Sequence, residues 1–166
     1  MHKWEILTES FLSSLNETDR KNYKMLIDIL VSYEYQPYKK QTKGIVMTFN
    51  NLIHNRVIAN MGMREKSDKP FFGLRFSACT EYPEKFHEVV RNRILSSKRR
   101  PAKCAVCNYC GGPKHVYVYP FPDGVQTDCG AFVLEIPDIN EQDVEEIRKL
   151  IDIQHHYFMT YAVKEK

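Results

Sequence analysis

Four of the five cysteines in the chain lie between residues 104 and 129. Cys104, Cys107 and Cys110 are each separated by two residues, and Cys129 stands just before Gly130. Thiols that are crowded in this way bind a metal ion or form disulfides. The spacing is typical of a structural zinc site, in which a cysteine knuckle and a second β-turn supply four thiolates. We therefore predict that Cys104, Cys107, Cys110 and Cys129 bind zinc.

Two alternatives to zinc stay open. The Cys-x2-Cys-x2-Cys spacing also begins ferredoxin-type motifs, where a distant fourth cysteine can complete an iron–sulfur cluster. The thiols can also be reduced and free of metal. If Cys107 or Cys110 is not a ligand, His115 is the nearest substitute. A zinc ion with four sulfur ligands keeps no open coordination position, so its predicted role is structural.

No complete catalytic constellation is visible, and we predict no catalytic residue. Cys79 follows a predicted strand without a neighbouring histidine, and we interpret it as a small buried hydrophobe. His155 and His156 are adjacent on a predicted helix and point about 100° apart, so they do not share a metal. We expect one of them at the edge of the core and the other in solvent. The protein is thus predicted to be non-enzymatic, and an iron–sulfur or thiol redox protein is the alternative.

Length and charge limit the class of protein. The chain has 166 residues, of which 43% are hydrophobic, and this composition predicts one folded domain. Its 24 basic and 21 acidic side chains give a formal charge of +3, a small excess for a protein driven onto nucleic acid by phosphate contacts. A local patch remains an option, formed by Tyr109, Tyr117, Tyr119 and the basic residues around the knuckle: Arg91, Arg93, Lys98, Arg99, Arg100, Lys103 and Lys114.

The N-terminus has no unbroken apolar run, and no segment approaches the roughly 20 apolar residues that cross a bilayer. We therefore expect a cytoplasmic protein without a membrane partner. In the cytoplasm thiols stay reduced, which favours a metal site over disulfides.

Hydrophobic periodicity predicts four helices and six strands. Two helices precede Pro37, a third follows Thr80, and a fourth is capped by Asn140. The predicted strands are residues 44–49, 56–61, 71–76, 115–119, 125–129 and 131–136. Tight hairpins between them favour an α+β fold, with an antiparallel or mixed sheet and helices packed on one face, plus a small zinc-ribbon-like cysteine knuckle and hairpin.

Residues 44–94 carry a β-hairpin, a third strand (Phe71-Phe-Gly-Leu-Arg-Phe76) and a helix, and Phe132-Val-Leu-Glu-Ile-Pro-Asp138 precedes the last helix. In this order of elements the chain resembles the small YdhG-like domains of unknown function. The resemblance implies an α+β fold and supplies no catalytic residues. It makes residues 1–166 a single domain and residues 101–130 a metal-binding insertion. We predict a binding or regulatory module whose hairpin presents Tyr117 and Tyr119 to an unknown small molecule or protein.

Overall fold

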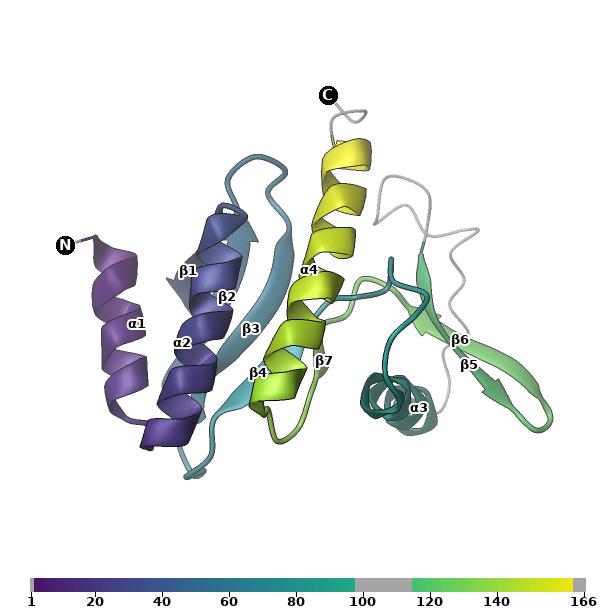
Figure 1. The fold of residues 1–166 in the computed structure, drawn as a ribbon, viewed down its shortest axis with the longest axis horizontal. Coiled ribbons are helices and arrows are strands. Elements are labelled where there is room, and N and C mark those ends of the chain that lie inside the picture. The colour runs from purple at the N-terminus through teal and green to yellow at the C-terminus, as the bar shows by residue number, and fades with distance from the viewer. Residues whose placement is uncertain (1, 98–114, 163–166) are drawn as a thin grey trace.

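The structure is a computed structural model that describes residues 2–97 and 115–162. Helices alternate with groups of antiparallel strands (Figure 1). The helices are α1 (Lys3–Ser13), α2 (Glu17–Ser32), α3 (Glu84–Ser97) and α4 (Glu141–Ala162). The strands are β1 (Tyr35–Lys39), β2 (Gly44–Asn51), β3 (Val57–Arg64), β4 (Phe71–Leu74), β5 (Val116–Phe121), β6 (Gly124–Cys129) and β7 (Leu134–Glu135).

Five strands form one sheet in the order β1-β2-β3-β4-β7, and every neighbouring pair is antiparallel. Residues in register across such a sheet point to the same face. One cross-strand row is formed by Phe49, Ala59, Leu74 and Leu134. All four are buried, so this face of the sheet belongs to the core.

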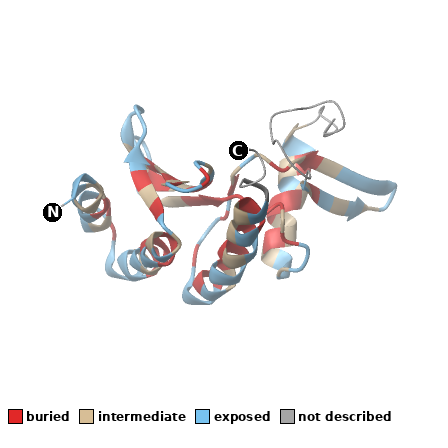
Figure 2. Cartoon of the chain, turned by 90° about the horizontal axis from the view of Figure 1, so that it is seen from above, coloured by how far each residue is buried: buried red, intermediate tan, exposed pale blue. Residues whose placement is uncertain are grey.

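Helices α2 and α4 cover that buried face, and Figures 1 and 2 show both on the same side of the sheet. Their inward residues repeat at helical spacing and are no more than 4% exposed. They are Leu26, Ile27 and Leu30 on α2, and Val144, Ile147, Leu150 and Ile151 on α4. The core lies between these two helices and one sheet face, and it extends to Phe11 of α1 and to Phe86 and Val90 of α3.

The opposite face of the sheet is not covered by these helices. Its central row crosses all five strands as Tyr38, Thr48, Asn60, Gly73 and Glu135. Tyr38 and Glu135 are exposed, and Thr48 and Asn60 are half-buried. Gly73 leaves room for the Asn60 side chain, which a Cβ atom at that position would strike.

Strands β5 and β6 form a separate two-stranded sheet joined by a tight turn. This hairpin packs beside α3, away from α1 and α2 (Figure 1). Among the described residues, no helix is both long and apolar enough to cross a bilayer.

The predicted α+β class, with an antiparallel sheet, is confirmed. The predicted cap at Asn140 is also confirmed, because its Oδ1 accepts the Asp143 N–H at 2.8 Å. For the second helix the sequence allows Asn16 or Thr18 as the cap, and the structure has Asn16, whose Oδ1 accepts the Asp19 N–H at 2.8 Å. Strand β1 was not predicted. The second helix ends at Ser32, Glu34 turns the chain with φ 67°, and an edge strand begins at Tyr35. An edge strand accommodates Pro37, whose missing N–H faces away from the ladder.

Candidate functional site

The described end of the predicted metal site is Cys129, the last residue of β6. It lies in register with Val116, the first residue of β5. Cys129 is half-buried and is not in a disulfide. Cys104, Cys107 and Cys110 lie outside the described residues, as does the predicted knuckle. Five residues lie between Cys110 and Val116 along the chain, which limits the distance between these two residues to about 20 Å.

A buried ion pair fixes the backbone at Cys129. Asp128 Oδ1 accepts the Cys129 N–H at 2.7 Å, and Asp128 Oδ2 accepts a hydrogen bond from Arg93 Nε at 3.1 Å. The Asp128 side chain is 2% exposed and that of Arg93 is 35% exposed. The strand that carries Cys129 is therefore attached to α3 at that position.

Tyr117 does not face a partner, and this corrects the sequence prediction. It is 1% exposed and stacks edge-on against Phe76, with ring centroids 5.2 Å apart. Its hydroxyl accepts the Phe76 N–H and donates to the Phe132 carbonyl at 2.6 Å. Strand alternation puts Tyr117 and Tyr119 on one face, and the packing of α3 turns that face inward.

The described basic residues of the predicted nucleic-acid patch have partners within the protein. Arg93 binds Asp128 and lies over the Phe132 ring, 4.3 Å from its centroid. Arg91 lies 3.8 Å from Glu88. Since Tyr117 is also buried, the described residues do not form the predicted patch around the hairpin. The remaining basic residues of that patch, Lys98, Arg99, Arg100, Lys103 and Lys114, lie outside the described residues, as does Tyr109.

A second polar cluster, which sequence reasoning missed, centres on the buried hydroxyl of Tyr35. That hydroxyl lies 3.1 Å from His54 Nε2 and 3.0 Å from His155 Nδ1. The three groups come from β1, the β2–β3 turn and α4. We name them the tyrosine–histidine chain. Its hydrogen bonds connect edge strand β1 to the last helix, α4.

The direction of the hydrogen bonds in this chain follows from its neighbours. The Arg56 N–H donates to His54 Nδ1 at 3.2 Å, so the proton of neutral His54 is on Nε2 and is donated to Tyr35. The Tyr35 hydroxyl then donates to His155 Nδ1. Because Nδ1 of His155 accepts this hydrogen bond, the proton of neutral His155 is on Nε2.

Burial favours the neutral form of all three groups. Desolvation lowers the pKa of His54 to about 4, and the nearby His155, Arg56 and Arg75 add to this shift. Desolvation also lowers the pKa of His155, reinforced by His156 and opposed by Asp152 and Glu34. Burial raises the pKa of Tyr35. At neutral pH the chain is therefore a set of uncharged hydrogen-bond partners.

The turn that holds His54 is built by Asn51. Its Oδ1 accepts the N–H of Ile53 at 2.7 Å and that of His54 at 3.2 Å. Its amide group donates to the Tyr33 carbonyl at 2.9 Å. Such an asparagine turn is the local signal that could have located His54.

The prediction for the adjacent histidines is confirmed: His155 lies at the edge of the core, and the side chain of His156 is 71% exposed. Cys79 is also packed as predicted. It is 6% exposed, and burial raises the pKa of its thiol to about 12. A thiol held protonated in this way is a poor nucleophile. Within residues 2–97 and 115–160, no three histidine, cysteine or carboxylate side chains are grouped to hold a metal.

Comparisons with known proteins give no relative. No family model, curated protein or solved structure matches the chain. The similarity to YdhG-like domains therefore stays a prediction, and function has to be argued from the residues themselves.

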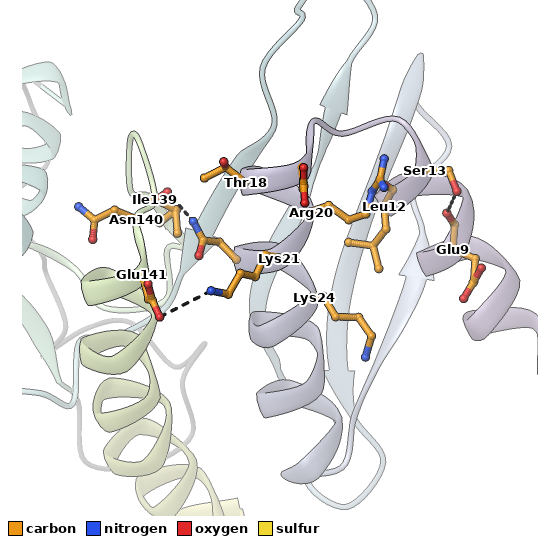
Figure 3. Close-up of a pocket in the computed structure, with 12 residues that line it drawn as sticks. Glu9, Leu12, Ser13, Thr18, Arg20, Lys21, Lys24, Ile139, Asn140 and Glu141 are labelled. Carbon is orange, nitrogen blue, oxygen red and sulfur yellow. Dashed lines mark hydrogen bonds and ion pairs between the residues drawn. The ribbon is translucent and has the colours of Figure 1, made fainter.

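A cleft of about 940 Å³ opens between α1, α2 and the start of α4 (Figure 3). Its three basic side chains, Arg20, Lys21 and Lys24, have partners within the protein. The Arg20 guanidinium donates to the carbonyls of Leu12 and Leu15 at the end of α1, and Lys21 lies 3.9 Å from Glu141. The cations that line the cleft are therefore engaged in internal contacts, and we assign the cleft no ligand.

Proposed function

We propose that the protein is a non-enzymatic binding module in which Cys104, Cys107, Cys110 and Cys129 bind one structural zinc ion. The observation that carries the proposal is the position of Cys129. Cys129 is half-buried on a strand fixed by the Arg93–Asp128 pair, in register with Val116, the second described residue after the other three cysteines. A metal bound by all four thiols would join the hairpin to the segment that precedes it.

The donor set agrees with zinc. Four thiolates suit a tetrahedral zinc ion, and such sites contribute on the order of 10 kcal/mol to folding. A cytoplasmic location would keep the thiols reduced and available for the ion. The metal's role in this proposal is to hold the hairpin in place, while other surfaces of the module contact the partner.

The test is the metal content and visible absorbance of protein purified without oxygen. We expect about one zinc per chain and no colour. Iron with a cluster absorbance would replace this proposal with the iron–sulfur alternative. Absence of any metal would contradict it.

Two cysteine variants make the test specific. Cys129→Ala should lose tightly bound zinc, because it removes one of four ligands. Cys79→Ala is the matched control, since Cys79 is buried against the Leu150 carbonyl and has no place in the site. If Cys129→Ala keeps the full zinc content, Cys129 is not a ligand.

A further inference from the structure

The face of the five-stranded sheet opposite α2 and α4 carries stacking groups. Tyr38 is 46% exposed on the edge strand β1. On β3 and β4, the Arg64 guanidinium lies over the Phe71 ring, 3.9 Å from its centroid, and pairs with Glu135. One flat side of the Arg64 guanidinium therefore lies on the half-buried Phe71 ring, and its other flat side faces outward. Rings and guanidinium planes of this kind are surfaces on which nucleic-acid bases stack.

The two groups are separated across the sheet. Tyr38 is in register with Thr48 on β2, and Arg64 is in register with Gly44 on the same strand. Strand geometry places them about 10 Å apart laterally and about 13 Å apart along the strands. Between them on this face lie Thr48 and Asn60, then half-buried Val46 and buried Gly62, so the surface is shallow.

Positive charge gathers at one end of this face. The β1–β2 and β3–β4 turns are at the same end of the sheet, because Gly44 pairs with Arg64. From residue 39 to 43 and from 64 to 69 they carry six cations and two carboxylates, and Glu135 beside Arg64 reduces the local excess to three, which equals that of the whole chain. All eight side chains belong to exposed residues: Lys39, Lys40, Lys43, Arg64, Glu65, Lys66, Asp68 and Lys69.

We propose that this face of the sheet binds single-stranded nucleic acid. Bases would stack on Tyr38 and on the Arg64 guanidinium, and phosphates would contact the lysines of the two turns. The proposal rests on the protein being a binding module and does not depend on the metal. The charge excess argues against a second copy as the occupant, since two such faces would bring like charges together.

The experiment is fluorescence anisotropy of labelled oligo-uridine and oligo-thymidine with the metal-loaded protein over a range of salt concentrations. We expect single strands to bind more tightly than a duplex of equal length, with affinity falling as salt rises. No binding at low salt, or tighter binding of the duplex, would overturn the proposal. Because zinc content is measured separately, such a failure would leave the metal proposal intact.

Tyr38 tests the stacking step. Tyr38→Ala should weaken binding about fivefold to a hundredfold, as for the loss of one stacked base. Tyr38→Phe keeps the ring and should keep the affinity. Equal affinity for Tyr38→Ala and the wild type would overturn stacking on this face.

The lysine turn tests the charge step against a matched control. Replacing Lys39, Lys40 and Lys43 together by Gln should lower affinity and reduce the salt slope by up to about 2. The control replaces three lysines of α2 and α4 by Gln, each of them near a carboxylate: Lys21, Lys24 and Lys149. An equal loss of affinity in both triple variants would mean that the strand is attracted only by the overall charge of the protein. That result would overturn the proposed binding site. The proposal would also be overturned if the wild type sediments as a dimer and Tyr38→Ala sediments as a monomer, because this face would then be a dimer interface.

Discussion

The hydroxyl of Tyr35 lies 3.0 Å from Nδ1 of His155, although 120 residues separate them in the chain. Tyr35 is fully buried on the edge strand, and His155 is on the last helix. The contact joins the first strand of the sheet to its covering helix through a polar group inside the core. A buried polar group of this kind stabilises the fold only while its partners are present.

Removing the Tyr35 hydroxyl should therefore be costly. Tyr35→Phe leaves the Nε2–H of buried His54 without its acceptor, and we expect a loss of about 1–3 kcal/mol in the free energy of unfolding. The measurement is urea unfolding at neutral pH. Tyr33→Phe is the control, because Tyr33 donates to the half-exposed Asp152 carboxylate and water can replace it. Its cost should stay below about 1 kcal/mol, and an equal cost for the two variants would contradict our account of the buried hydrogen bonds.

The tyrosine–histidine chain should also make stability depend on pH. The pKa of His54 is lowered to about 4 in the fold, below its usual 6.5. Between these values the unfolded chain binds the proton that the folded chain refuses, so the free energy of unfolding falls as the pH drops from about 6.5 toward 4. His155, whose pKa is also lowered, acts in the same direction. His54 alone can account for on the order of 3 kcal/mol at most.

Urea unfolding at several pH values between 7.5 and 5 measures this effect. His54→Asn should reduce the slope of stability against pH. His2→Gln is the control, since His2 is exposed and lies outside the tyrosine–histidine chain. An unchanged slope in His54→Asn would show that other groups cause the pH dependence.

Local sequence signals predicted much of the fold, because they act over a few residues. The caps at Asn16 and Asn140 and the buried helix stripes follow from neighbours three or four positions apart. Strand β1 was missed because Pro37 and the lysines after it are typical of a turn. Its pairing with β2, from Tyr35 opposite Asn51 to Lys39 opposite Met47, makes this segment an edge strand.

The candidate sites were harder to predict, because they depend on which face meets the core. Alternation predicts that Tyr117 and Tyr119 share a face, but the docking of α3 decides that this face is buried. The contact of Tyr35 with His54 and His155 joins segments 19 and 120 residues away. No local pattern contains such a contact.

The Arg93–Asp128 pair should hold the β5–β6 hairpin in place. Arg93→Met would leave the nearly buried Asp128 carboxylate without its cation, and we expect a loss of about 2 kcal/mol, below the usual range because Arg93 is partly exposed. Thermal unfolding gives the overall cost, and amide exchange of β6 shows whether the loosening is local. Arg91→Met on the same helix is the control. Its exposed pair with Glu88 should contribute less than about 0.5 kcal/mol, and a similar effect of both variants would contradict the role assigned to Asp128.

Alkylation should distinguish the two described cysteines. Cys79 is buried and its pKa is raised to about 12, so iodoacetamide should modify it only when the protein unfolds. Cys129 is half-buried, and if its thiol binds zinc it should react slowly until a chelator removes the ion. Peptide mapping by mass spectrometry, with and without chelator, follows each thiol separately.

Chelator should accelerate the labelling of Cys104, Cys107, Cys110 and Cys129 together, because one ion protects all four. A Cys129 rate that does not change with chelator would remove it from the metal site. Labelling of Cys79 at the same accelerated rate would mean that losing the metal unfolds the whole domain rather than the hairpin alone.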